Sequence, residues 1–202
     1  MPALYALDPF LLVQAALASP WLDLPMALLT TACEGWSMAV IGIALILVME
    51  RGLERSIRSA FPVLLSLLAS GLVVQLVKRL VHLPRPLTVL GAARVHLVLE
   101  PLGQLSFPSG HAAAVAALAM ALTIRYGRRV GWVWVLAFLG GLSRVYVGAH
   151  WVTDVAAGWS VGLACGLAVA LLLRARASQG TNVPLAPRRT ASRTVRSATE
   201  AA

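Results

Sequence analysis

Three short groups of polar residues, distant from one another in the sequence, carry side chains that can bind and transfer a phosphate group. The groups are Lys78 with Arg85, then Ser109, Gly110 and His111, and finally Arg144, His150 and Asp154. Lysine and arginine supply positive charge, and a guanidinium can bind two phosphate oxygens at once. Histidine can exchange a proton near neutral pH or attack phosphorus as a nucleophile. These residue types predict a phosphate site if folding brings the groups together.

The three cations stand at the ends of apolar stretches. Lys78 is the only lysine in the chain. An ammonium in such a position either reaches the lipid headgroups or faces the interior of a helical bundle. Headgroup contact is the ordinary explanation for one cation, but three cations at one membrane surface are better explained by a phosphate that they bind together. We therefore predict that Lys78, Arg85 and Arg144 hold one phosphate.

The second group combines a helix start with an imidazole. Ser109 can cap the helix that follows, and the unpaired amides of the first turn, Gly110 among them, can point at an anion. A helix cap accounts for Ser109 but leaves His111 unexplained, because a histidine in the first turn of an apolar helix gains nothing unless it faces a polar pocket. We therefore expect His111 to face the phosphate.

The third group contains a histidine and an aspartate four residues apart. If a helix begins near His150, Asp154 lies on the same face, and its carboxylate can accept the imidazole Nδ1 proton. This contact would orient the ring and make Nε2 more nucleophilic. A histidine and an aspartate at a membrane edge are ordinary when alone, and they become specific as members of this ordered set.

The stretch from Lys78 to Asp154 resembles, in order and spacing, the signature of the type 2 phosphatidic acid phosphatase family. That family includes bacterial undecaprenyl diphosphate phosphatases, soluble acid phosphatases and vanadium haloperoxidases. The resemblance implies that His150 attacks phosphorus and forms a phosphohistidine, with Asp154 steadying its ring. It also implies that His111 protonates the leaving oxygen and then activates water.

The resemblance implies that fixed cations take the role of a metal ion. The residues expected to stabilise the phosphate oxygens are Lys78, Arg85, Ser109, Gly110 and Arg144. No group of Asp, Glu, Cys or His stands at metal-ligand spacing. We therefore expect neither a metal nor another cofactor.

The elements that must position these groups are membrane helices. The 202 residues are 59% hydrophobic with a mean hydropathy of +0.80, whereas soluble domains are about 45–50% apolar with glycine included. Charged residues make up 12% and cluster between long uncharged stretches. We predict an all-α integral membrane bundle over residues 1–176. Residues 177–202, rich in Ser, Thr, Pro, Ala and Arg, are predicted to be a disordered basic cytoplasmic tail.

Five apolar stretches are long enough to cross about 30 Å of hydrocarbon. They cover residues 26–49, 60–80, 109–125, 130–147 and 152–173. A sixth stretch, residues 3–18, contains Asp8 and Pro9 and stops at Ser19-Pro20, which favours a short interfacial or re-entrant helix. Glu34 lies within the first span, where a carboxylate is costly. Structural pairing and a role in a substrate channel are both open for it.

Arginines flank these stretches and predict their orientation. The clusters are Arg51, Arg55 and Arg58, then Arg125, Arg128 and Arg129, and finally Arg174 and Arg176. Cytoplasmic loops are enriched in such residues, so we predict a multi-pass protein of the inner or plasma membrane with its active site on the extracytoplasmic side. The basic residues behind the net charge of +9 are then expected to contact anionic lipid headgroups and to set the orientation of the protein in the membrane. No nucleic-acid partner is expected.

The expected function is the metal-independent hydrolysis of a phosphate monoester or diphosphate of a lipid. Undecaprenyl diphosphate, phosphatidic acid and phosphatidylglycerol phosphate all remain candidate substrates, and the oligomeric state is open. A phosphotransferase of the same family is the nearest alternative. A non-catalytic protein that binds anionic lipids would need the cations only, so the presence of His111, His150 and Asp154 disfavours it. A haloperoxidase would need vanadate and usually a soluble domain.

Overall fold

The computed structural model describes residue 5, residues 7–99 and residues 103–180, and this part of the chain is helical with no strand. The α-helices are α1 (Phe10–Leu17), α2 (Pro20–Ala32), α3 (Gly35–Met49), α4 (Leu53–Val81), α5 (Pro86–Leu90), α6 (Gly110–Tyr126), α7 (Val133–Tyr146) and α8 (Val152–Gly180). Two short 3-10 helices are η2 (Ala92–Arg94) and η3 (Gly127–Val130). The predicted all-α class is thus confirmed.

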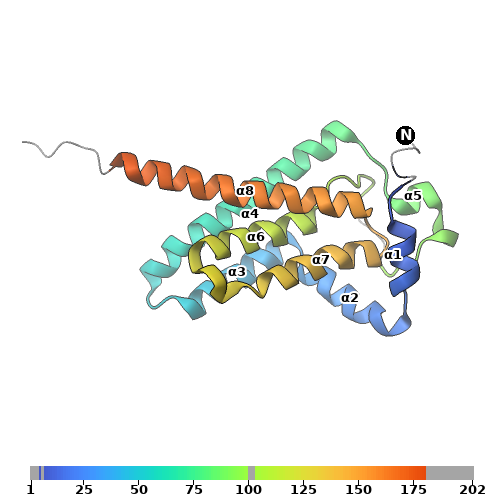
Figure 1. Ribbon diagram of the computed structural model, residues 1–202, viewed down its shortest axis with the longest axis horizontal. Helices are drawn as coiled ribbons and strands as arrows, with labels where there is room; N and C mark the ends of the chain where they lie inside the picture. Colours follow the sequence, from blue (N-terminus) through green and yellow to red (C-terminus); the bar gives the residue numbers. More distant parts are fainter. Residues whose placement is uncertain (1–4, 6, 100–102, 181–202) are drawn as a thin grey trace, which may run out of the picture.

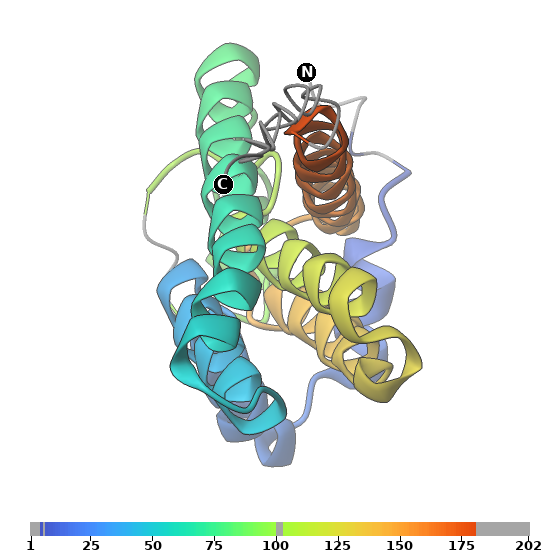
Figure 2. The same cartoon turned by 90° about the vertical axis from the view of Figure 1, so that its left-hand side faces the viewer.

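Helix α6 forms the centre of the bundle, with α3, α4, α7 and α8 packed around it (Figures 1 and 2). Its alanines are buried almost throughout, and their small side chains let the neighbouring backbones come close. Helix α8 contacts α6 through two glycines. A Cβ at Gly162 would lie 2.2 Å from the carbonyl oxygen of Ala113, and one at Gly158 would lie 2.4 Å from that of Ser109. These two glycines therefore let the backbones of α6 and α8 pack closely.

Two helices, α4 and α8, are long and apolar enough to cross a membrane. Helices α2 and α3 meet the same criterion only as a pair, which would make a third span. Helix α6 has 17 residues and α7 has 14, so both are shorter than the roughly 20 residues that usually cross the hydrocarbon. The described residues thus contain two or three candidate spans, and the five spans that the sequence predicts are not confirmed.

The predicted span over residues 26–49 is not one helix. The chain bends by 76° between α2 and α3, with Cys33 and Glu34 at the break. Glu34 has an extended backbone and precedes the first turn of α3. A charged residue in the middle of an apolar stretch is more stable where the helix opens onto a polar space than inside a continuous span. The break therefore brings Glu34 to a cavity wall.

The amino-terminal helix α1 is short, as predicted, and stops before Pro20. The side chain of Gln14 attaches it to the end of α7 by donating hydrogen bonds to the carbonyl oxygens of Val145 (3.2 Å) and Tyr146 (3.0 Å). Residues 3, 4 and 6 of the predicted 3–18 stretch lie outside the described residues. An interfacial or re-entrant position for α1 remains a prediction.

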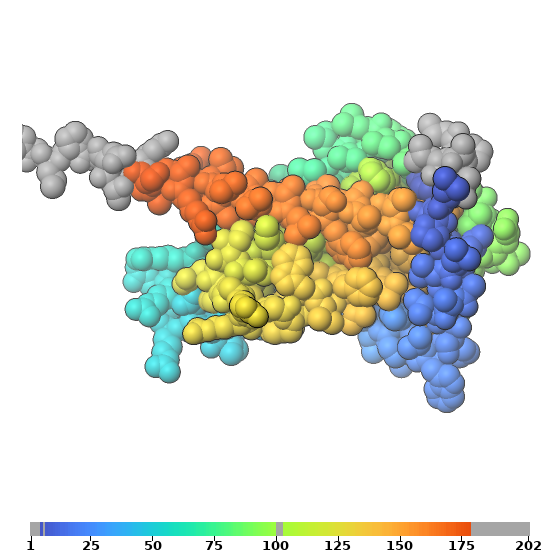
Figure 3. All heavy atoms as spheres, viewed as in Figure 1, coloured from blue at the N-terminus to red at the C-terminus, as the bar shows by residue number. Residues whose placement is uncertain are grey.

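The bundle has two distinct ends. One contains the α3–α4 turn, η3 and the last turns of α8, and these carry the three arginine clusters; we call it the arginine end (Figures 1 and 2). The other contains the end of α4, the start of α6 and the α7–α8 turn, and we call it the site end. Figure 3 shows α8 extending beyond the body of the bundle at the arginine end. Helix α8 continues to Gly180, and residues 181–202 of the predicted tail lie outside the described part.

Candidate active site

A cavity of about 480 Å³ at the site end brings the three predicted groups together. Six of the eight predicted site residues line it: Lys78, Arg85, Gly110, His111, Arg144 and His150. They come from the end of α4, the loop before α5, the start of α6, the end of α7 and the α7–α8 turn. The other two, Ser109 and Asp154, are fully buried behind this wall. The convergence expected from membrane topology is therefore present.

Main-chain carbonyl groups position two of the cations. The Lys78 ammonium donates hydrogen bonds to the carbonyl oxygens of Leu105 (2.8 Å) and Ser106 (3.1 Å). The Arg85 guanidinium donates from Nε to Gly103 O (2.8 Å) and from Nη1 to Ala149 O (2.7 Å). Carbonyl oxygens fix these groups in space and leave the full charge of Lys78 to act on a ligand. Arg85 is also buried, at 7% exposure.

Arg144 is held from the opposite wall and has an unused donor. Its Nη1 donates a hydrogen bond to the Thr30 hydroxyl of α2, at 2.7 Å. Its Nε is buried and has no hydrogen-bond partner among the described residues. An unsatisfied buried donor costs about 1–3 kcal/mol, so an anionic oxygen entering the cavity would remove that cost.

His150 and Asp154 lie against each other, as their spacing predicts. Asp154 Oδ2 is 3.4 Å from His150 Nδ1 and accepts the backbone N–H of Trp151 at 3.0 Å. The Ser106 hydroxyl donates to the same oxygen, and its own oxygen is 3.4 Å from His150 Nδ1. Both contacts to Nδ1 are long for a hydrogen bond. The imidazole is thus oriented by a carboxylate and a hydroxyl together, which leaves Nε2 as its other ring nitrogen.

The surroundings of His150 favour its neutral form. Burial lowers the pKa of the imidazole well below its usual value, and the charges of Arg144, Arg85 and Lys78 lower it further. A protonated imidazole has no lone pair on Nε2 with which to attack. The cations that would bind a phosphate therefore also keep His150 in the nucleophilic form.

The start of α6 supplies the remaining polar groups. His111 lies on the first turn and lines the cavity, as expected. Ser109 caps the helix, because its side-chain oxygen accepts the Ala112 N–H at 3.5 Å, and its own N–H donates to Asp154 O at 3.0 Å. These contacts connect the first turns of α6 and α8. Ser109 therefore acts as a helix cap in this structure, and its hydroxyl as a phosphate ligand remains a prediction.

Two side chains of the site were not predicted from the sequence. Ser106 contacts both His150 and Asp154, and Thr30 accepts the hydrogen bond from Arg144. Ser106 lies in an irregular loop, and Thr30 lies in a stretch interpreted as a membrane span. Neither has a spacing pattern that connects it to its partner, because both contacts depend on tertiary structure.

Glu34 stands in the wall of the same cavity. Its Oε2 accepts a hydrogen bond from Trp36 Nε1 at 2.6 Å, and no ion pair of Glu34 is found in the described part of the chain. Of the two interpretations that the sequence left open, this position favours the one in which Glu34 faces the substrate. A carboxylate here accepts hydrogen bonds and opposes further negative charge.

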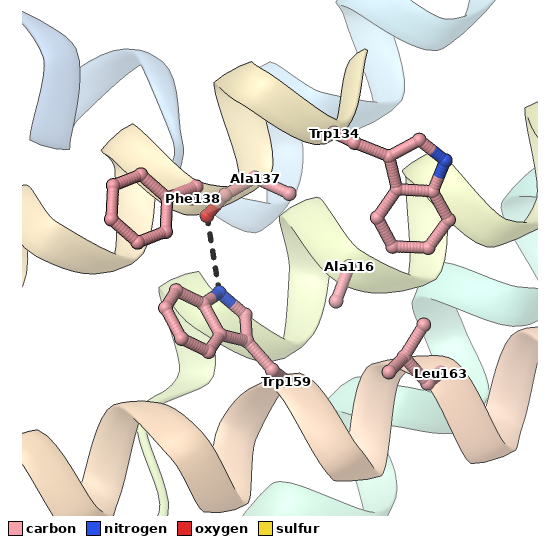
Figure 4. A pocket seen from close by; sticks show the side chains of 6 residues that line it. All are labelled: Ala116, Trp134, Ala137, Phe138, Trp159 and Leu163. Atoms are coloured by element: carbon pink, nitrogen blue, oxygen red, sulfur yellow. Dashed lines mark hydrogen bonds between the residues drawn. The ribbon is translucent and has the colours of Figure 1, made fainter. Parts of the chain in front are cut away.

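A second cavity, of about 230 Å³, lies between α6, α7 and α8 and has a different chemistry (Figure 4). Its lining residues are Ala116, Trp134, Ala137, Phe138, Trp159 and Leu163. The indole N–H of Trp159 donates to Ala137 O at 3.1 Å, so it is already satisfied. No charged side chain lines this space, which makes it unsuitable for phosphate.

The charged side chains that line the first cavity are three cations and the single carboxylate of Glu34, and such a wall disfavours a metal ion. No group of three or more metal-ligating side chains occurs among residues 5, 7–99 and 103–180. The independence from metal remains a prediction that removal of divalent ions can test.

A family model described as the PAP2 superfamily matches residues 59–178, which is more than half of the chain and includes every predicted site residue. Among curated relatives, undecaprenyl-diphosphatase BcrC of Bacillus subtilis (strain 168) is 34% identical over 99 residues, which cover 48% of this chain and 49% of that protein. The chain thus spans less than half the length of the curated undecaprenyl-diphosphatases that it matches.

Two solved structures share the fold. Aquifex aeolicus LpxE superposes with a TM-score of 0.71 at 24% identity, covering 82% of this chain and 96% of that one. A transmembrane PAP2-type phosphatidylglycerolphosphate phosphatase from Bacillus subtilis superposes with a TM-score of 0.63 at 23% identity, covering 87% and 88%. At these identities the likeness concerns the arrangement of helices.

Proposed function

Since this chain belongs to the PAP2 superfamily, we propose that it is a membrane phosphatase that hydrolyses a phosphate monoester or diphosphate of a lipid. The observation that carries the proposal is the single cavity in which Lys78, Arg85 and Arg144 surround His111 and His150. The apolar surface of α4 and α8 and the two or three candidate spans support a lipid as the source of the phosphate.

In the proposed reaction, His150 Nε2 attacks phosphorus, forming an N–P bond while the P–O bond to the lipid breaks. His111, protonated because the negative charge of the bound phosphate favours its imidazolium form, donates a proton to the departing oxygen and is left neutral. It then takes a proton from water, whose oxygen attacks the phosphohistidine and displaces His150 as phosphate leaves. Each histidine ends in its starting state, and the sum is hydrolysis of one P–O bond.

The cations and the backbone supply the electrostatic part. Lys78, Arg85 and Arg144 would contact the equatorial oxygens of the phosphoryl group, joined by the Gly110 amide at the start of α6. Because their side chains are already fixed by carbonyl and hydroxyl groups, little reorganisation is needed during the reaction. Phosphoryl transfer depends chiefly on such positioning and charge, which is why the proposed mechanism uses no metal.

Three lipid phosphates remain candidate substrates. A diphosphate of undecaprenol is supported by the curated relatives, and phosphatidylglycerol phosphate is supported by the name of one solved structure. Phosphatidic acid is the simplest monoester that the cavity can hold. The cavity volume of about 480 Å³ suits a lipid headgroup, so the lipid tail would lie in the bilayer. By the positive-inside rule the site would open on the extracytoplasmic face.

The test is phosphate release by the purified protein in detergent with EDTA, using the three lipids side by side. We expect release from at least one lipid in the presence of EDTA, and its loss in His150→Ala. The matched control is His82→Asn, which changes an exposed histidine outside the cavity and keeps a residue tolerated in the left-handed conformation. Release that requires an added metal, or that persists in His150→Ala, would contradict the proposal.

Adding an alcohol acceptor to the same assay separates hydrolysis from phosphotransfer. A hydrolase releases inorganic phosphate and leaves the acceptor unchanged. Appearance of the phosphorylated acceptor as the main product would assign the chain to the phosphotransferases of the family.

A further inference from the structure

A third cavity, of about 240 Å³, lies at the arginine end between α4, α6 and α8. Figure 2 looks toward this end, with α4 and α8 on opposite sides of α6. Its lining combines small residues (Ser66, Ala121, Gly166 and Ala170) with the larger apolar side chains of Pro62, Ile124, Val169 and Leu173, and it includes two arginines, Arg125 and Arg174. It shares no residue with the candidate active site.

This third cavity, which we call the groove, exists because small side chains face one another on three helices. The Ser66 hydroxyl donates to Pro62 O at 2.7 Å, so the wall presents no free hydroxyl of this residue. From Arg174 to Gly166 the groove follows two turns of α8, or about 12 Å at 1.5 Å per residue. Its interior is therefore narrow, apolar and directed from the arginine end toward the middle of the bundle.

The mouth of the groove carries excess positive charge. Arg125 donates from Nη2 to Glu50 Oε1 at 2.7 Å and from Nε to the Ser59 hydroxyl at 3.0 Å. Arg174 is exposed, and it makes no hydrogen bond or ion pair with any other described residue. Glu50 thus neutralises one arginine, and the second charge remains for an external anion.

We propose that this groove binds an anionic glycerophospholipid from the leaflet at the arginine end, which the positive-inside rule assigns to the cytoplasm. The headgroup phosphate pairs with Arg174 and with the outer face of Arg125, and one acyl chain lies along the small-residue wall. The combination of an apolar groove and an uncompensated cation at its mouth matches a lipid with a net negative headgroup. A free inorganic anion would contact the arginines but leave the apolar interior unfilled.

The test measures binding of phosphatidylglycerol and phosphatidylcholine to the full chain in a neutral detergent, by native mass spectrometry and by the shift of the unfolding temperature. We expect phosphatidylglycerol to bind more tightly, and Arg174→Gln to weaken it about fivefold, as expected from about 1 kcal/mol per basic side chain near an anionic surface. The unfolding temperature without lipid should not change, because Arg174 has no hydrogen bond or ion pair with another described residue to lose.

Two further variants make the test specific. Arg176→Gln is the matched control, because Arg176 is exposed on the same helix but lies about 200° away around it. It should leave binding unchanged. Ala170→Leu should weaken the binding of both lipids, because the larger side chain fills the groove. If Arg174→Gln binds phosphatidylglycerol as tightly as the unaltered chain does, the lipid binds at another site and the proposal is overturned. If Arg174→Gln and Arg176→Gln lose equal affinity, the lipid is held by diffuse electrostatic attraction, which also overturns the proposal.

Discussion

The two ends of the bundle both carry cations but keep them in opposite environments. At the site end, Arg85 and Arg144 are buried at 7% and 8% exposure and are fixed by carbonyl or hydroxyl oxygens. At the arginine end, the side chain of Arg58 is 76% exposed and pairs with Glu54 one turn away, and Arg125 pairs with Glu50. Arginine side chains are therefore buried and fixed at the site end, and exposed or ion-paired at the arginine end.

The difference explains why chemistry is expected at only one end. An exposed ion pair is screened by water and salt and contributes little. A buried, fixed cation acts on a ligand at full strength and needs no rearrangement when charge develops. The cations of the site end also lower the pKa of His150, an effect that exposed arginines do not produce there. Variants that compare the two ends can test this account.

The largest expected contrast comes from the nucleophile. His150→Ala should lower kcat by about 10⁴-fold or more, because it removes the nucleophile of the proposed mechanism. Arg58→Ala, at the other end, should leave kcat unchanged. Phosphate release measures both, with circular dichroism to confirm folding. A His150→Ala enzyme with a tenth of the normal rate would remove this residue as nucleophile.

The next contrast compares one arginine from each end. Arg144→Gln should lower kcat/KM by about 10²–10³-fold, as expected for the loss of a fixed donor to the transition state. Arg125→Gln should change it by less than about threefold, because its partner Glu50 lies far from the cavity. Steady-state kinetics in one detergent provide both values. Equal losses would mean that the arginines act through folding.

The pH dependence of kcat/KM should respond to an arginine at the site end but not to one at the arginine end. Because the pKa of His150 is lowered, its neutral form persists below the ordinary value of about 6.5, and the acidic limb of kcat/KM that it causes lies below that pH. Arg85→Gln removes one of the depressing charges, so the His150 pKa rises and the limb moves to higher pH. Arg174→Gln should not move it. An acidic limb that moves to lower pH in Arg85→Gln would contradict the electrostatic account.

The smallest expected effect concerns the carboxylate in the cationic wall. Glu34→Gln removes a negative charge from the cavity, so it should favour a lipid diphosphate over a monoester by on the order of threefold in the ratio of kcat/KM values. Glu54→Gln, at the exposed arginine end, is the control. If Glu34→Gln alters neither this ratio nor the unfolding temperature, Glu34 has no role in selection or in packing.

Much of the site could be predicted because its geometry is local. The four-residue spacing of His150 and Asp154 brings the turn before α8 against the first turn of that helix, and the Ser109 cap fixes where α6 begins. The alternation of apolar stretches and arginines places the three polar groups at one end. The contacts of Ser106 and Thr30 could not be predicted, since each joins segments far apart in the chain.

The number of spans was predicted less well for a related reason. Hydropathy over residues 26–49 cannot reveal the 76° bend, because the sequence there contains only one charged residue, Glu34, and the bend depends on the cavity that this carboxylate faces. Helices α6 and α7 read as spans by composition, but α6 is surrounded by other helices and both are short. The apolar residues of α6 are largely buried against these neighbouring helices.

The most direct test of the account is to trap the phosphoenzyme. The protein is mixed with a lipid phosphate whose scissile phosphoryl group carries ³²P, quenched in alkali, where phosphohistidine survives, and mapped by peptide mass spectrometry. We expect label on His150 and none in His150→Ala. Label that persists in His150→Ala, or rapid turnover by the unaltered enzyme with no labelled histidine, would contradict the central claim.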